Sequence, residues 1–471
     1  MPLVDDLRDL LGPKRVKSSP LERRIYDKDS GVTRGEVLAV VFPETTQETA
    51  SCVRMAAKWD VPIVPRGAGT GLAGGAVPTE PGLIVSMMRM NRIWDVDTVG
   101  HTAWVGPGVI NLDLTRHTGQ MGLHYAPDPS SQSVCTIGGN VGTNAGGPHC
   151  LAEGTTVAHI LGVELVTPAG EVAVLGGAAP DPIGLDLRSV VVGSEGTLGV
   201  VTKVLVRLIE NPPAVSTLLL SYQDVEGAAR TVSETIAAGI VPAAMEMMDR
   251  PMVEAVENFV HAGYPTDAAA VLLTEVTGHP SAVGAETEII AEIARLAGAS
   301  EVRVAADQVE RERLWLGRKS AFGAVAQAAP DYYLHDTVVP RTRLVEVMSK
   351  LYEISARHDI LMLNVFHAGD GNLHPLMAFD AKEPGVMDRV MAAGDEIVRL
   401  SIAVGGSLSG EHGIGLEKRK FMSEVFDEVS LDAQARLRDA FDPDGVMNPG
   451  KILPAGSRCF DFDFPSVAEA V

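Results

Sequence analysis

The sequence of 471 residues has little of three features that mark particular classes of protein. Its four cysteines, Cys52, Cys135, Cys150 and Cys459, lack the spacing of a zinc knuckle, an iron–sulfur cluster or a redox pair. No run of lysine and arginine interrupts a formal net charge of −22, which argues against nucleic acid as a partner. No stretch approaches the roughly 18 consecutive apolar residues of a membrane span, and residues 1–20 lack the apolar core of a secretory signal. We therefore expect a cytoplasmic protein without a membrane span or a metal cluster of its own.

What the chain does have is enough apolar sequence to build large cores. Hydrophobic residues make up 46% and charged residues 21%, as in globular proteins. Residues 37–66 predict a β-α-β opening, and Asn211-Pro212-Pro213 marks a boundary. Beyond it, strands alternate with helices near 225–238, 281–297, 307–328 and 342–357, which predicts helices on one side of a sheet. We divide the chain into a polar leader, 1–36, two domains, 37–212 and 213–425, and a C-terminal segment, 426–471, that returns to the first domain.

Three glycine-rich stretches in the first half of the chain each predict a loop that binds a ligand. The first, residues 65–75, follows the apolar run 61–64 and leaves successive backbone N–H groups available to a phosphate. Pro78 and Pro81 prevent it from continuing as a helix, so we reject the nicotinamide dinucleotide fingerprint. The second stretch, 127–147, is too polar for a core element and too long for a plain connector. The third is 191–200.

Residues 366–375 predict a β-hairpin with two histidines on one face. Asp370-Gly371 is a strong hairpin signal, and a two-residue turn there pairs His367 with His374. Directly opposed residues have Cβ atoms roughly 5 Å apart, which suits two ligands of one divalent metal ion. A carboxylate is the usual third ligand, and Glu411, set among glycines, is the candidate. The spacing fits equally well two histidines that are hydrogen-bonded within a polar hairpin.

Six stretches, taken together in this order, resemble the vanillyl-alcohol oxidase family of flavoproteins, in its branch of FAD-linked D-2-hydroxyacid dehydrogenases. They are residues 65–71, 138–147, 192–199, 367–374, 410–413 and 448–451. The resemblance covers most of the chain, from about residue 37 to residue 452. It implies an α+β fold in which an FAD-binding domain of two subdomains precedes a substrate-capping domain with a ferredoxin-like antiparallel sheet.

The resemblance implies that the glycine-rich stretches hold FAD, with the first loop around the pyrophosphate. No histidine between residues 65 and 75 offers a covalent tether, so we expect FAD to be bound non-covalently. The positions implied to line the cofactor are Pro65, Arg66, Gly67, Ala68, Gly69, Thr70, Gly71, Pro127, Ser133, Gly138, Gly139, Asn144, Gly146, Glu195, Gly196, Gly199, Val200 and Asn448.

The resemblance also assigns roles around the hairpin. It makes His367, His374 and Glu411 ligands of a divalent metal, zinc or another transition metal, and His412 the general base beside the flavin. Arg318, three residues after a tryptophan, resembles the clamp for the substrate carboxylate. The alternative for Arg318 is a solvated face of the charged helix 307–319.

Three positions depart from relatives that act on 2-hydroxyglutarate. This chain has Leu334, Leu376 and Phe322 where those relatives offer polar groups, so we expect a smaller, more apolar pocket. The expected reaction is oxidation of a small 2-hydroxyacid, glycolate or D-lactate, to the 2-oxoacid. D-2-hydroxyglutarate dehydrogenation, a non-redox flavin-adduct synthase and a metal-dependent hydrolase are the alternatives.

Without a cysteine cluster, the chain has nothing of its own to receive electrons from the flavin. The resemblance implies companion subunits, one flavin-fold and one iron–sulfur, that pass electrons to a membrane quinone. We therefore expect a cytoplasmic protein that its partners can bring to the inner face of the membrane.

Overall fold

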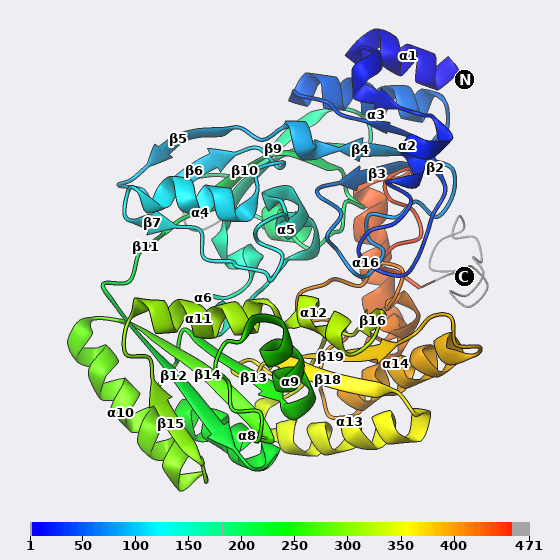
Figure 1. The fold of residues 1–471 in the computed structure, drawn as a ribbon. Coiled ribbons are helices and arrows are strands. Elements are labelled where there is room, and N and C mark those ends of the chain that lie inside the picture. Colours follow the sequence, from blue (N-terminus) through cyan, green and yellow to red (C-terminus); the bar gives the residue numbers. More distant parts are fainter. Residues whose placement is uncertain (1, 180–182, 455–471) are drawn as a thin grey trace. The chain divides into compact units, whose positions relative to one another are not determined.

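The computed structural model describes residues 2–179 and 183–454, which form two compact units. Unit 1 comprises residues 1–146, 155–211 and 411–471, and unit 2 comprises residues 147–154 and 212–410. Figure 1 shows both, coloured along the sequence. Cys459 lies outside the described residues, as do the other residues beyond 454 in the expected C-terminal segment.

Unit 1 begins with a small sheet whose three longer strands are parallel. The strand order is β1-β2-β4-β3, and β1 runs antiparallel to β2. Helix α3 connects β2 to β3, and the Thr45 side chain caps it by accepting a hydrogen bond from the Glu48 N–H. Val53 of this helix is fully buried with Ile63 and Leu83 of the sheet. The bounds are Val16–Lys17 (β1), Val37–Val41 (β2), Ile63–Arg66 (β3), Gly82–Ser86 (β4) and Thr46–Lys58 (α3).

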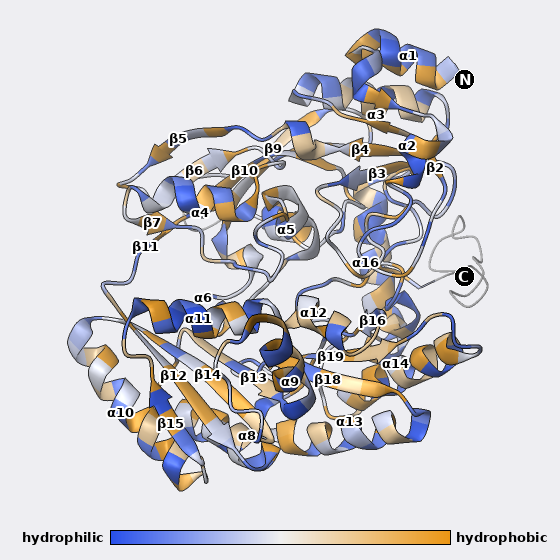
Figure 2. Cartoon of the chain, in the orientation of Figure 1, coloured by the Kyte–Doolittle hydropathy of each residue, from blue (hydrophilic) through white to orange (hydrophobic). Residues whose placement is uncertain are grey.

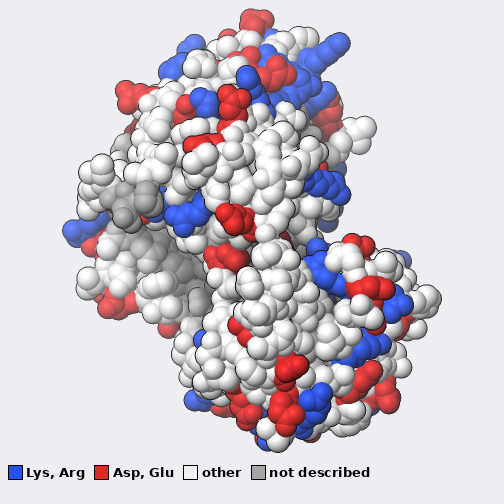
Figure 3. All heavy atoms as spheres, turned by 90° about the vertical axis from the view of Figure 1, so that its left-hand side faces the viewer, with Lys and Arg blue, Asp and Glu red and all other residues white. Residues whose placement is uncertain are grey.

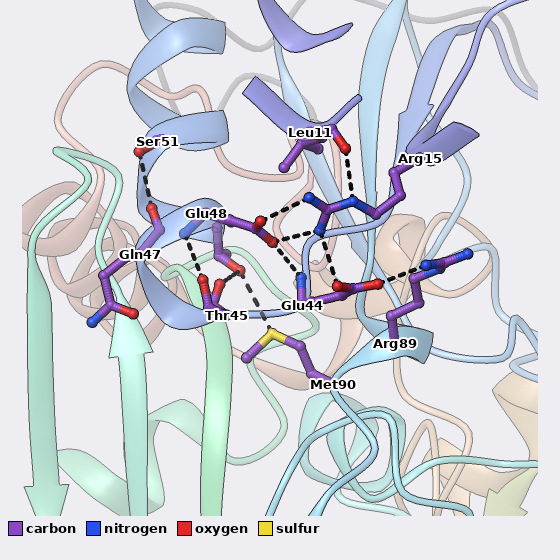
Figure 4. A network of polar contacts seen from close by, with 10 residues as sticks. Leu11, Arg15, Glu44, Thr45, Gln47, Glu48, Ser51, Arg89 and Met90 are labelled. Carbon is purple, nitrogen blue, oxygen red and sulfur yellow. Dashed lines mark hydrogen bonds and ion pairs between the residues drawn. The ribbon is translucent and has the colours of Figure 1, made fainter. Parts of the chain in front are cut away.

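The expected polar leader, residues 1–36, contains a strand that pairs with this sheet and a helix that packs on α3. Helix α1 (Pro2–Leu11) buries Leu3 and Leu7 in the same core and contacts α3. Arg15 donates hydrogen bonds of 2.7 and 2.8 Å to the Glu48 carboxylate and one to the Leu11 carbonyl (Figure 4). The apolar residues at 3, 4, 7 and 11 follow a helical period that the acidic residues between them conceal. A short helix, α2 (Pro20–Arg24), follows.

The second sheet of unit 1 is antiparallel, with the order β5-β6-β10-β8-β9. Helix α5 lies within the second glycine-rich stretch, which we had expected to be a loop throughout. The Thr136 side chain caps this helix, and a Cβ on Gly138 would lie only 2.5 Å from Pro107 Cβ, so glycine permits close packing. The strands are β5 (Ile93–Asp97), β6 (Thr102–Val105), β8 (Ile160–Val166), β9 (Val172–Gly176) and β10 (Val200–Arg207), and β7 (Leu123–His124) pairs separately with β11 (Ile209–Glu210). The helices are α4 (Asn111–Gly119), α5 (Ile137–Thr143), α7 (Leu187–Val191), α15 (Met422–Val425) and α16 (Glu428–Phe441).

Unit 2 is built on an antiparallel sheet of eight strands. Their order is β15-β12-β14-β13-β18-β19-β16, with β17 also paired to β19. Figure 2 shows hydrophobic residues along the long strands. The strands are β12 (Ala214–Tyr222), β13 (Ala244–Asp249), β14 (Ala270–Gly278), β15 (Glu301–Val304), β16 (Asp331–Leu334), β17 (Thr337–Val338), β18 (Leu361–His367) and β19 (Asn372–Phe379). The helices are α6 (Cys150–Glu153), α8 (Val225–Ala237), α9 (Arg250–Val260), α10 (Pro280–Leu296), α11 (Gln308–Lys319), α12 (Ala321–Ala324), α13 (Leu344–His358) and α14 (Val386–Ala403).

Helices cover both faces of this sheet, and not one face as expected. Glu246 and Asp249 are three residues apart in β13, so their side chains point to opposite faces. Glu246 contacts Arg318 of α11, whereas Asp249 accepts a hydrogen bond from Tyr352 of α13. Every residue of β13 is buried as a result.

Composition reveals only one of the points at which the chain passes between the units. The observed boundary after residue 211 is within a residue of the expected one, but the return to unit 1 begins at Glu411 and not at 426. Residues 1–36 belong to unit 1. Residues 147–154 leave unit 1 and join unit 2, an excursion too short to change the local composition.

The surface mixes charges of both signs. Lysine and arginine side chains intermingle with aspartate and glutamate on the face drawn in Figure 3, with uncharged areas between them. Within the described ranges, no helix has both the length and the apolar character that crossing a bilayer requires.

Candidate active site

The two hairpin histidines share one face of the sheet, but in a register other than the expected one. Strands β18 and β19 pair His367 with Asn372 and Val365 with His374, so residues 368–371 form a four-residue turn. The expected two-residue turn was wrong, because the Gly371 N–H closes a wider loop on the His367 carbonyl. His367 and His374 are therefore diagonal neighbours, with ring centroids 5.0 Å apart.

Glu246, which sequence reasoning missed, joins this face from the neighbouring strand. Strand β13 pairs it directly with His367, and its carboxylate oxygens lie 2.8 and 2.9 Å from His367 Nδ1. Burial by itself would raise the pKa of Glu246, but the charges of His367 and Arg318 and the hydrogen bonds from both side chains together lower it. The signal that could have identified it is a single carboxylate within the apolar run 244–248.

Arg318 lies in the interior of unit 2, so the alternative of a solvated helix face is wrong. It is 1% exposed, and its Nε and Nη2 both lie 2.6 Å from Glu246 Oε2. Helix α11 packs closely here because Gly317 has no side chain: a Cβ there would lie 2.6 Å from Ala262 Cβ. One buried carboxylate thus bridges a guanidinium and an imidazole.

A second buried carboxylate fixes the segment that leads to Glu411. Asp336 is fully buried and accepts hydrogen bonds from the Gly410 N–H, at 3.0 and 3.1 Å, and from the Ser409 hydroxyl. A Cβ on Gly410 would lie 2.4 Å from Asn372 Cγ, so this position requires glycine. Glu411 follows Gly410 directly in the chain.

The three residues expected as metal ligands come together. One potential ligand atom from each of His367, His374 and Glu411 lies within 4.8 Å of the other two, and all three residues are buried. Two imidazoles and one carboxylate suit zinc or another transition metal with coordination positions left for substrate. A metal-binding histidine commonly gives its other ring nitrogen to a carboxylate, as His367 gives Nδ1 to Glu246. The donor set therefore fits a divalent metal.

His412 follows Glu411, and its Nε2 lies 3.8 Å from Glu411 Oε1. Its side chain is 15% exposed, more than that of Glu411. An imidazole in this position can take up a proton and return it to water.

The three positions expected to make the pocket apolar lie near the histidines of unit 2. Leu334 and Leu376 are direct cross-strand partners and both are buried. Leu376 is two residues beyond His374 and therefore on the same face of β19. The ring of Phe322 meets that of His374 edge-on, with centroids 6.4 Å apart.

The first glycine-rich stretch of unit 1 offers its backbone to a ligand. We expected no helix directly after this stretch, and the next element after β3 is indeed the strand β4. Among the described residues, no backbone N–H from Gly67 to Gly71 donates to another backbone group. A Cβ on Gly67 would lie 2.4 Å from Thr136 Oγ1, so the first and second stretches pack against each other. Such a row of N–H groups fits the pyrophosphate of FAD.

Three expected cofactor residues use their side chains to hold these loops. Arg66 Nη2 donates to the Lys28 carbonyl at 2.8 Å, beneath Gly69. Asn448 Nδ2 donates to the carbonyls of Gly75 and Glu195 at 2.8 and 2.6 Å. The Glu195 carboxylate accepts hydrogen bonds from residues 414 and 415.

The remaining expected cofactor positions all belong to unit 1, and their contacts with FAD stay predictions. Pro65 ends β3 with Arg66, and Ala68 and Thr70 lie in the first loop. Asn144 has φ +53° at the end of α5, and its Oδ1 accepts a hydrogen bond from the Val157 N–H. The others are Pro127, Ser133, Gly138, Gly139, Gly146, Gly196, Gly199 and Val200.

The bridge of Glu246 predicts a specific pattern of stabilities. Glu246→Leu leaves Arg318 buried without its counter-charge, so the free energy of unfolding should fall by about 3–5 kcal/mol. Adding Arg318→Met to that variant should restore about 2 kcal/mol, because no unpaired charge then remains. Urea unfolding measures both, and Glu346→Leu, at an exposed pair with Lys350, is the control that should change stability by less than about 1 kcal/mol. A double variant less stable than Glu246→Leu would contradict the bridge.

Two family models match the chain. An FAD binding domain model matches residues 37–176, and a model of the C-terminal domain of FAD linked oxidases matches residues 211–452. The chain is 46% identical over 429 residues to glycolate oxidase subunit GlcD of Escherichia coli, covering 91% of this chain and 86% of that one. It is 31% identical to a D-lactate dehydrogenase of Anaerostipes hadrus, over 94% and 95% of the two chains.

Solved structures confirm the expected fold class. The 4-ethylphenol oxidase of Gulosibacter chungangensis superposes with a TM-score of 0.81 at 18% identity, over 97% of this chain and 98% of that one. The FAD binding domain model covers the first two glycine-rich stretches, and the C-terminal domain model covers the histidine hairpin. The chain therefore belongs to the family of FAD-linked oxidases.

Proposed function

We propose that this chain oxidises a short 2-hydroxyacid, glycolate or D-lactate, to the 2-oxoacid. The observation that carries the proposal is the buried group of His367, His374 and Glu411, with Arg318 linked to it through Glu246. A 2-hydroxyacid offers two oxygens for a metal and a carboxylate for a guanidinium, which matches this set. The names of the relatives, a glycolate oxidase subunit and a D-lactate dehydrogenase, support the same substrate class.

Each side chain has a distinct role in the proposal. FAD supplies the acceptor of the Cα hydride, and the divalent metal supplies a Lewis acid that lowers the pKa of the substrate hydroxyl. Arg318 turns Nε and Nη2 to Glu246, so its third nitrogen, Nη1, is the group we assign to the substrate carboxylate. His412 in its neutral form takes the hydroxyl proton.

The size of the substrate follows from the apolar residues around His374. Leu334, Leu376 and Phe322 offer no hydrogen bond to a second carboxylate, and burying an unpaired carboxylate is costly. We therefore favour a monocarboxylate of two or three carbons over D-2-hydroxyglutarate.

The path of electrons leaving the chain belongs to the same proposal. GlcD is named as a subunit of an oxidase, which supports companion subunits for this chain as well. We propose that one flavin-fold and one iron–sulfur partner receive the electrons and that a cytoplasmic complex delivers them to a membrane quinone.

An anaerobic spectrum tests the proposed reaction. The purified protein with bound FAD should lose its flavin absorbance when titrated with glycolate or D-lactate and keep it with D-2-hydroxyglutarate. Bleaching by D-2-hydroxyglutarate alone would contradict the substrate class, and no bleaching by any hydroxyacid would favour a flavin-adduct synthase. A colourless protein would favour a hydrolase.

The base assignment predicts the effect of removing one imidazole. His412→Ala should retain FAD but reduce the flavin roughly 10²–10⁴-fold more slowly, the usual contribution of general acid–base catalysis. Stopped-flow absorbance at saturating substrate measures this rate. His117→Ala, at an exposed histidine of α4, is the matched control and should behave as the unaltered protein. A normal rate in His412→Ala would rule out the role.

The metal assignment predicts that chelation abolishes substrate reduction of the flavin without releasing FAD. Dialysis against a chelator should remove about one ion per chain, measured by atomic emission, and added zinc or cobalt should restore the rate. In His374→Ala the added metal should fail to restore it, because one of three protein ligands is missing. Full activity in metal-free protein would contradict the assignment.

A further inference from the structure

The Glu195 carboxylate occupies a space in unit 1 that two glycines leave open. A Cβ on Gly75 would lie 3.0 Å from Glu195 Oε2, and a Cβ on Gly413 would lie 2.8 Å from Oε1. Gly413 also has φ +86°, a conformation that other residues rarely adopt. The carboxylate thus packs directly against the residue that follows His412.

Hydrogen bonds tie this carboxylate to the next two residues of that segment. Oε1 accepts the Ile414 N–H at 2.7 Å, and the Gly415 N–H lies 2.9 Å from Oε2 and 3.1 Å from Oε1. Both donors are backbone groups, so the contact fixes the path of the chain and not the rotamer of one side chain.

Other groups contact both the backbone and the carboxylate of Glu195. Asn448 Nδ2 donates to the Glu195 carbonyl at 2.6 Å and to the Gly75 carbonyl at 2.8 Å. Burial raises the pKa of Glu195, while the two N–H donors and the charges of Lys451 and Lys418 oppose the rise. Lys451 is completely buried, and burial lowers its pKa to about 7.

We propose that Glu195 is a positioning residue that holds the segment carrying Glu411 and His412. The family resemblance placed Glu195 only among residues that line FAD, whereas its carboxylate binds the chain just beyond the metal ligand and the base. The expected effect on catalysis rests on the proposed function. The expected effect on the structure of residues 411–415 rests on the hydrogen bonds alone. Contacts between the backbone of residues 195–200 and FAD are compatible with it.

Hydrogen exchange of the FAD-bound protein tests the structural consequence. In Glu195→Gln one acceptor oxygen becomes an amide nitrogen, which cannot accept an N–H. Mass spectrometry of the peptide containing residues 411–416 should show exchange at Ile414 or Gly415, whichever N–H then faces the amide nitrogen, at least about tenfold faster than in the unaltered protein, equivalent to losing about 1.4 kcal/mol of protection. Flavin absorbance per chain should remain unchanged.

Kinetics of the same variant test the catalytic consequence. The rate of flavin reduction at saturating substrate should fall at least about tenfold, with KM changed less than the rate, since the base is displaced and Arg318 is not. Glu195→Asp keeps the charge but is one methylene too short to reach both N–H groups, so it should lose the same protection and rate. If Glu195→Gln does not fold, Glu195→Asp is compared with the unaltered protein in its place.

Glu164→Gln is the matched control. Glu164 is a largely buried carboxylate of unit 1 that binds Thr46, Thr202 and Lys203 and has no bond to residues 411–415. This variant should leave the exchange of Ile414 and Gly415, and the rate, unchanged.

The outcomes separate this inference from the proposed reaction. Loss of FAD from folded Glu195→Gln, or unchanged exchange at Ile414 and Gly415, would overturn the positioning role. Exchange is measured without substrate, so it tests Glu195 even if no hydroxyacid reduces the flavin, a result that would overturn the proposed reaction alone.

Discussion

The candidate site depends on one buried carboxylate that binds an imidazole and a guanidinium. Glu246 lies in a central strand, where every neighbouring residue is buried, and it accepts hydrogen bonds from both His367 and Arg318. A carboxylate is costly to bury, and that cost is offset here by its attraction to the two partners and by their hydrogen bonds. The same contact sets the orientation of the His367 ring and the position of the guanidinium, so the proposed metal ligand and the proposed substrate-binding group are fixed together.

In unit 1, buried polar side chains support the glycine-rich loops. Loops that present backbone N–H groups to a phosphate cannot satisfy those groups internally, so they need support from elsewhere. The Arg66 side chain packs against Gly69 of the first loop and donates to the Lys28 carbonyl. Asn448 bonds the first and third stretches, and the Glu195 carboxylate bonds the third stretch to residues 414 and 415. The residues that motif reading assigned to the cofactor therefore include several whose side chains shape the loops that would hold it.

Sequence reasoning identified elements whose cause is local and failed where the cause is distant. The glycine stretches, the histidine hairpin and the helices of unit 2 follow from turn residues and apolar period. The hairpin register failed because the turn at Gly371 closes a loop of four residues, although the histidines still share a face. Helix α1 was missed because its stability comes from burying Leu3 and Leu7 against α3. A carboxylate within an apolar run marks Glu246, but nothing in the local sequence identifies Arg318, 72 residues later in the chain, as its partner.

The most direct test of the central claim is anomalous X-ray scattering at the zinc absorption edge, from crystals of the protein loaded with zinc and FAD. We expect one peak about 2.0–2.2 Å from His367 Nε2, a ring nitrogen of His374 and a carboxylate oxygen of Glu411. Glu246 should remain hydrogen-bonded to His367 Nδ1 and to Arg318. The absence of a peak among these three residues, or an ion bound to His367 Nδ1 with Glu246 turned away, would contradict the account.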